Sequence, residues 1–145
     1  MSTNTILING QVLPAVLVRA LDEGWWAFPL CNDALASMFP PHTDTSAAML
    51  YSLEIMQREN HNLVKSLSRP PDFLGTPGAG EPGTLDPARA VIIGDLGPDC
   101  PIALDYRNSP ESPGVVYFAV RDWHGVWQRI ADCIEDFVSL LGIHA

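Results

Sequence analysis

Residues 90–107 of the chain read AVIIGDLGPDCPIALDYR, and this stretch decides the fold. Two apolar runs, residues 91–93 and 101–104, flank a tip that is rich in glycine, proline and aspartate. Glycine tolerates positive φ angles, and proline and aspartate favour bends, so the tip is typical of a turn. The stretch therefore predicts a β-hairpin with an acidic loop.

The sequence that follows predicts a third strand and a closing helix. Residues 115–120 are β-branched and aromatic and follow a turn-forming segment, residues 109–114, so they extend the hairpin to an antiparallel meander. The chain then ends in an amphipathic helix, where Asp132 and Glu135 have the spacing of a capping box. The expected buried positions of this helix are Ile134, Phe137, Val138 and Leu141.

The order of these pieces resembles one known family. The chain has Ile-Gly-Asp-x-Gly at residues 93–97, Ala-Leu-Asp-Tyr-Arg at 103–107, Trp-x-x-Ile-Ala at 127–131, and Phe137 in the final helix. Together they are similar to the SUKH superfamily, which includes many predicted bacterial immunity proteins and fungal regulators of cell-wall glucan assembly. The resemblance implies a single α+β domain in which helices flank a mainly antiparallel β-sheet.

The same resemblance implies a function without catalysis. The bacterial members imply an immunity protein that binds and neutralises a cognate toxin, often a basic nuclease, as in toxin–antitoxin systems. The fungal members imply an alternative, which is a regulatory or scaffold module that binds an endogenous protein.

The composition predicts one packed domain over residues 1–145. This length is that of one ordinary domain, and a chain with 47% hydrophobic and only 17% charged residues is expected to fold. The formal net charge is −9. A field of this sign repels nucleic acids and anionic membranes and attracts basic proteins, so we expect a basic protein partner and neither of the other two.

Three features of the chain predict a cytoplasmic protein. The N-terminal residues lack the basic and apolar segments of a secretory signal. The chain also lacks an uninterrupted run of the roughly 20 apolar residues that a membrane span needs. Its three cysteines are odd in number and far apart, which favours reduced thiols over a disulfide framework.

Upstream of the hairpin, the sequence predicts two main helices and a loop. One apolar stripe predicts a helix that ends at Gly24, and another predicts a helix over residues 53–67 with a serine N-cap. Residues 33–38 suit a short helix and residues 49–51 a short strand. Residues 70–87 hold five of the thirteen prolines and are expected to form a surface loop.

The aspartates of the hairpin form the first candidate site. Carboxylates gathered at one end of a hairpin can bind a hard cation or serve as a general acid and base. They can also complete turns, with Asp105 paired to Arg107 or another cation, or form an acidic docking surface for a partner. The sequence lacks the spacing of a calcium loop, a zinc site, a phosphate-binding loop or a nucleophile elbow, so we expect no catalytic residue, cofactor or metal. The partner-binding candidates are Asp95, Asp99 and Asp105.

Tryptophans supply the other candidates. Trp25 and Trp26 are adjacent, and two adjacent side chains of an extended segment cannot both point into one core, so one of them is expected to face a partner. Trp127 is expected in the core because of its spacing from Ile130.

Overall fold

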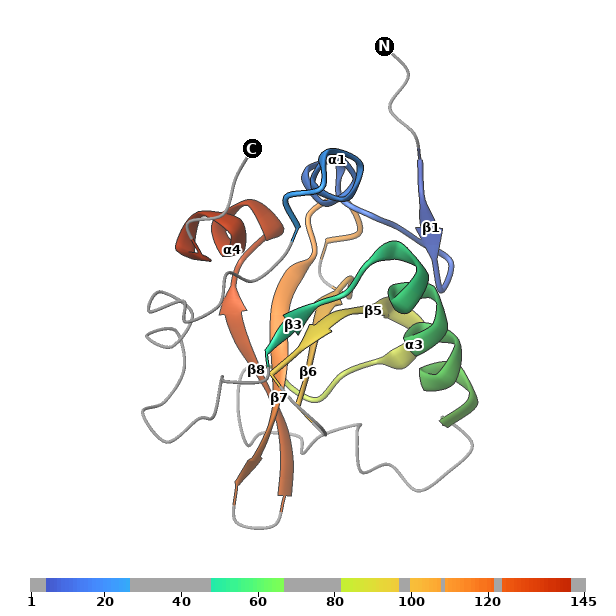
Figure 1. The fold of residues 1–145 in the computed structure, drawn as a ribbon. Helices are drawn as coiled ribbons and strands as arrows, with labels where there is room; N and C mark the ends of the chain where they lie inside the picture. Colours follow the sequence, from blue (N-terminus) through green and yellow to red (C-terminus); the bar gives the residue numbers. More distant parts are fainter. Residues whose placement is uncertain are drawn as a thin grey trace.

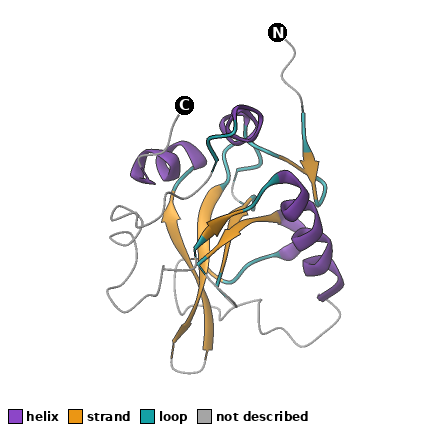
Figure 2. Cartoon of the chain, viewed as in Figure 1, coloured by secondary structure: helices purple, strands orange, loops and turns teal. Residues whose placement is uncertain are grey.

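The fold of the protein is built around one antiparallel sheet. The computed structural model describes residues 5–26, 48–66, 82–96, 100–107, 109–121 and 124–141. Within them, six strands form a sheet in the order β3-β5-β6-β7-β8-β4, and three α-helices lie around it (Figures 1 and 2). The predicted α+β class is confirmed.

The elements of the main sheet are β3 (Met49–Leu50), β4 (Pro82–Gly83), β5 (Ala90–Asp95), β6 (Pro101–Asp105), β7 (Gly114–Arg121) and β8 (His124–Ala131). A separate two-stranded sheet consists of β1 (Leu7–Ile8) and β2 (Gln11–Val12). The helices are α1 (Ala15–Glu23), α3 (Leu53–Ser66) and α4 (Ile134–Leu141), and a short 3-10 helix, η1, covers Pro87–Arg89.

The predicted meander is present, and it is longer than the sequence indicated. β5 pairs with β6 and β6 pairs with β7, as expected for the hairpin and the third run. β8 was not predicted, yet it pairs with β7 along nearly its whole length, with Trp127 opposite Phe118. The two rings lie 5.2 Å apart, and Trp127 is completely buried, so its predicted core position is confirmed.

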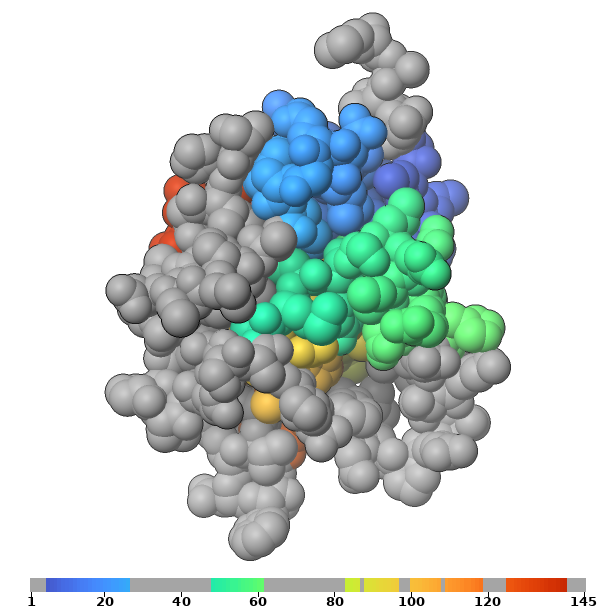
Figure 3. All heavy atoms as spheres, viewed as in Figure 1, coloured from blue at the N-terminus to red at the C-terminus, as the bar shows by residue number. Residues whose placement is uncertain are grey.

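Helix α3 is fixed to β5 by a buried asparagine. On the edge of β5 that faces β3, the pairing with β3 covers only Asp95 and Gly94 and stops short of Ile92. The Asn60 side chain accepts a hydrogen bond of 2.7 Å from the Ile92 N–H and donates one of 2.8 Å to the Ile92 carbonyl. α3 therefore packs against β5, and β3 lies beside β5 in the sheet, so the atoms of β3 and α3 adjoin those of β5 in Figure 3.

Gly94 of the Ile-Gly-Asp segment is needed for a close approach of two strands. A Cβ atom at this position would lie 2.6 Å from the backbone oxygen of Met49 in β3. That is too short for a contact with backbone, so a side chain would push β3 away from β5. The glycine therefore belongs to the packing of the sheet.

Helices α1 and α4 pack together at one end of the sheet (Figure 1). α1 ends where Gly24 adopts a left-handed conformation with φ of 79°, as its sequence predicted. Three of the four residues predicted to be buried in α4 are buried, and the side chain of the fourth, Leu141, is not among those that the structure describes. The completely or nearly completely buried members are Ile134 and Phe137, and Val138 is 8% exposed.

Two sequence predictions need correction. Within the expected loop of residues 70–87, Pro82–Gly83 forms β4 on β8, and Leu85 is buried. The earlier part, residues 70–81, lies outside the described residues, as does the predicted helix over 33–38. The capping position of α4 was also wrong by one residue, because the helix starts at Ile134 and Cys133 precedes it.

Candidate functional site

The structure separates the aspartates of the hairpin. Asp95 pairs with Pro101 at one end of the β5–β6 ladder, whereas Asp105 pairs with Ala90 at the other. The five-residue rise along β5 corresponds to roughly 16 Å, so these two carboxylates cannot share a cation or a substrate atom. Asp99 lies outside the described residues. Asp95 and Asp105 therefore do not form a metal site or an acid–base pair with each other.

Asp95 binds a tyrosine that directly follows β3. The Tyr51 hydroxyl donates a hydrogen bond of 2.5 Å to Oδ2 of Asp95, and the Tyr51 N–H donates to the Ile93 carbonyl. Burial raises the pKa of Tyr51 well above its ordinary value, and the hydrogen bond and negative charge of Asp95 raise it further. These contacts tie the turn between β3 and α3 to β5, so Asp95 has a structural role.

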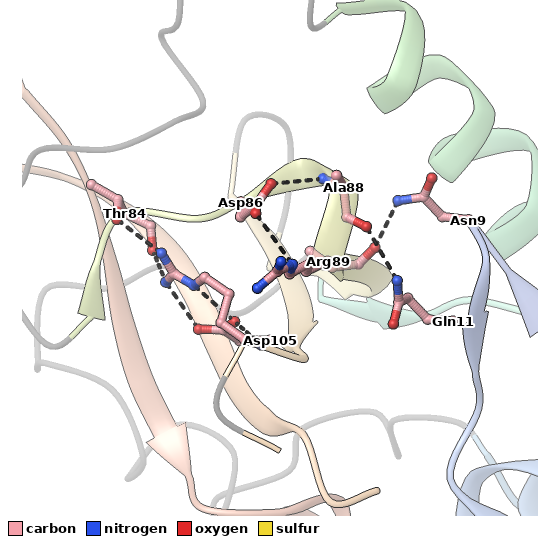
Figure 4. Close-up of polar contacts among 9 residues, drawn as sticks. Asn9, Gln11, Thr84, Asp86, Ala88, Arg89 and Asp105 are labelled. Carbon is pink, nitrogen blue, oxygen red and sulfur yellow. Dashed lines mark hydrogen bonds and ion pairs between the residues drawn. The ribbon is translucent and has the colours of Figure 1, made fainter. Parts of the chain in front are cut away.

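Asp105 belongs to a cluster of polar side chains that Arg107 and Thr84 complete. Arg107 donates to the two oxygens of Asp105 at 3.1 and 3.0 Å, which confirms the predicted pairing. The same guanidinium donates to the hydroxyl of Thr84 at 3.1 Å and to its carbonyl at 2.6 Å (Figure 4). Asp105 is only 5% exposed, so it does not contribute to an exposed acidic surface. The cluster instead fixes the segment after β4 to the end of β6.

The neighbouring polar side chains serve the fold in a similar way. Asn9 and Gln11, on the β1–β2 hairpin, donate to the carbonyls of Ala90 and Ala88 at 3.0 and 3.1 Å (Figure 4). The Tyr106 hydroxyl donates to the Val12 carbonyl at 2.8 Å, and burial raises the pKa of Tyr106 well above its ordinary value. These bonds hold the small hairpin against the start of β5.

The two adjacent tryptophans differ in burial. Trp26 is buried and its ring centre lies 6.4 Å from that of Phe137, so it fills the space between α1 and α4. Its indole nitrogen has no hydrogen-bond partner among the described residues. Trp25 is half-buried, and its indole nitrogen donates to Glu23 at 3.2 Å. Trp25 is therefore the member of the pair that a partner can reach.

A groove between the end of β8 and α4 was not predicted. It has a volume of about 550 Å³ and is open to solvent. One wall is formed by the end of β8 and the turn after it, and the other by one side of α4. The lining residues are Arg129, Ile130, Ala131, Asp132, Asp136, Ser139 and Leu140.

The groove combines an exposed apolar side chain with acidic ones. Leu140 is 50% exposed, although most large apolar side chains of the described residues are buried. Asp132 and Asp136 are exposed, and Arg129 lies 3.8 Å from Asp132. The available signal in the sequence was Leu140 itself, an apolar residue beside the buried stripe of its helix.

The two described cysteines, Cys100 and Cys133, are half-buried thiols. The backbone N–H of Asp136 lowers the pKa of the Cys133 thiol, but burial and the charges of Glu135 and Asp136 outweigh it, so the pKa is raised overall. A thiol with a raised pKa is a poor nucleophile at neutral pH. Among the described residues, no group of histidine, cysteine and carboxylate side chains has a metal-binding arrangement.

Comparison with known proteins finds no counterpart: the chain matches no family model, no curated protein and no solved structure. In the part of the chain that the structure describes, no helix has both the length and the apolar character that crossing a membrane requires.

Proposed function

We propose that this chain is a non-enzymatic protein-binding domain, and specifically a SUKH-type immunity protein that binds and neutralises a basic toxin domain in the cytoplasm. The resemblance of residues 90–141 to that superfamily supplies the family and the class of partner. The net charge of −9 supports the basic character of that partner.

The proposal is supported mainly by a difference among the carboxylates, some of which are bonded within the fold while others are exposed to solvent. Asp95 and Asp105, in the segments that resemble the family, bind Tyr51 and Arg107 and thereby help to fix the turn after β3 and the segment after β4. Other carboxylates remain exposed at the end of the molecule where α1 packs on α4. These exposed acids are Asp22, Glu23, Asp132, Glu135 and Asp136.

Such a surface suits recognition of a basic protein. Exposed charges raise the rate of encounter with an oppositely charged partner, and apolar or aromatic side chains nearby supply the contacts that slow its release. Trp25, half-buried beside Glu23, and Leu140, half-exposed on α4, are available for such contacts.

The test starts with capture of the partner. The tagged full-length chain is expressed in its source cell, and the proteins that co-purify are compared with those retained by an unrelated acidic protein of similar charge. We expect a basic protein that arrests growth when expressed alone and that no longer does so when this chain is co-expressed. A specific partner that is harmless on its own would favour the regulatory or scaffold role, and the absence of any specific partner would contradict protein binding.

A further inference from the structure

We propose that the groove between β8 and α4 is the surface on which the basic partner docks, and that it receives an apolar side chain flanked by lysine or arginine. This inference rests on the proposed function and names the surface that would carry it. Three features of the groove support this role: its shape, its apolar residue and its charges.

The shape of the groove favours a protein segment over a small molecule. Pockets for small ligands enclose most of the ligand surface, whereas this groove, of about 550 Å³, is largely open to solvent. Its two walls come from a strand end and a helix that are both fixed to the core. Ala131 is buried below one wall, and Phe137 anchors the helix from its inner side. The groove is therefore a preformed surface that a partner can enter without rearranging the fold.

The outer side of α4 supplies the apolar contact. Asp136 and Leu140 are four residues apart and lie on one side of the helix, with Ser139 beside them. Ile130 also lines the groove, and it is half-buried and packed against the core. A partner side chain placed between Leu140 and Ile130 would remove both from water, which is the contact that slows dissociation.

The charges of the groove select a cationic partner. The lining contains two carboxylates, Asp132 and Asp136, and one guanidinium, Arg129. Glu135, which precedes Asp136 in the sequence and is exposed, adds a third carboxylate to this part of α4. The Arg129–Asp132 pair contributes little to stability, because its nitrogen and oxygen atoms are 3.8 Å apart and the Asp132 side chain is 84% exposed. Asp132 can therefore exchange Arg129 for a partner cation at little cost.

A defined peptide tests the groove independently of any toxin. The probe is a short synthetic peptide in which one leucine is flanked by two lysines in a glycine-serine context, and it is titrated into the isotope-labelled full chain while the backbone amide resonances are followed. We expect saturable shifts at residues 129–132 and 136–140. A peptide in which serine replaces the leucine should bind about tenfold more weakly if Leu140 takes part.

Variants of the protein give the matched comparison. Asp136→Asn and Leu140→Ser should each weaken binding of the leucine peptide about tenfold. The control for charge is Glu54→Gln on α3, and the control for apolar exposure is Leu7→Ser on β1, where Leu7 is 60% exposed. Both controls should bind within about twofold of the unmodified chain. If Asp136→Asn perturbs α4, Ser139→Lys places a positive charge at an exposed position of the groove and should weaken binding as well.

The outcomes separate this inference from the proposed function. Shifts spread equally over all exposed acids, or variants of the groove that bind like the controls, would overturn the inference. If a toxin is captured and the groove variants still protect cells from it, the groove is wrong and the immunity function stands. If the peptide binds in the groove but no toxin exists, the docking surface stands and the immunity function is wrong.

Discussion

Two arginine–aspartate pairs in this protein differ in where they lie. Arg107 contacts Asp105 at 3.0 Å, and the Asp105 side chain is 4% exposed. Arg129 lies 3.8 Å from Asp132, whose side chain is 84% exposed. The same pair of residue types is thus an internal part of the fold in one region and part of a solvated groove in the other.

The difference shows why residue type alone does not identify a binding surface. A buried carboxylate needs its cation and its hydrogen bonds, because removal of one partner leaves an unpaired charge away from water. An exposed carboxylate is solvated with or without its cation, so its pairing contributes little to stability. Charges of the first kind are committed to the fold, and charges of the second kind are available to a partner.

The largest expected effect on stability concerns α4, which has a buried side and a solvent-exposed side. Phe137 is completely buried, so Phe137→Ala should lower the free energy of unfolding by about 3–5 kcal/mol. Leu140→Ala, on the exposed side of the same helix, should cost less than about 1 kcal/mol. Chemical denaturation measures both values. A loss below about 1 kcal/mol for Phe137→Ala would mean that the helix does not belong to the core.

The next effect concerns the buried pair itself. Asp105→Ala leaves the Arg107 guanidinium without its carboxylate, but the Arg107 side chain is 25% exposed and water can partly solvate it. We therefore expect a loss of about 2–3 kcal/mol, somewhat below the cost for a fully buried pair. A double-mutant cycle with Arg107→Met isolates the coupling. Strictly additive losses in that cycle would show that the two side chains do not stabilise each other.

Much of the fold could be predicted from local sequence patterns. The β5–β6 hairpin was predictable because apolar runs surround a tip of turn-forming residues, and α1 because an apolar stripe ends at a glycine. The short β4 could not be predicted, since proline and glycine normally interrupt regular structure. It forms because Gly83 pairs with Trp127, more than forty residues later, and because Arg107 binds the adjacent Thr84.

The candidate site was less predictable than the fold. Arg107 was one of the cations predicted for Asp105, and the structure shows that it is the partner. The separation of Asp95 from Asp105 follows from their places at opposite ends of the ladder, which depends on strand register. The groove combines the end of β8, which was not predicted as a strand, with the outer side of α4. Local patterns cannot reveal a surface that exists only when two elements pack together.

A smaller effect should appear at alkaline pH. The pKa values of Tyr51 and Tyr106 are raised in the folded protein, mainly by burial, so folding favours their protonated forms. Their contribution to stability is complete below the unfolded-state pKa of about 10 and is lost as the pH rises above it. Above that pH, each tyrosine should lower the free energy of unfolding by about 1.4 kcal/mol per pH unit. Denaturation at several pH values should show a shallower decline for Tyr51→Phe and for Tyr106→Phe than for the unmodified chain. An unchanged slope in both variants would contradict these two pKa directions.

The smallest effect on stability is expected at the exposed pair, and it provides the sharpest comparison. Asp132→Ala should change the free energy of unfolding by less than about 0.5 kcal/mol, because its carboxylate is solvated and only loosely paired. The same change should slow association with the lysine–leucine peptide and reduce the dependence of that rate on salt, since one attracting charge is lost. Asp105→Ala, measured where the variant is still folded, should leave peptide binding unchanged. Two results would contradict this comparison. Asp132→Ala could destabilise the protein as much as Asp105→Ala does, or it could bind the peptide as the unmodified chain does. Either result would show that the exposed carboxylate does not differ from the buried one in the way that the docking surface requires.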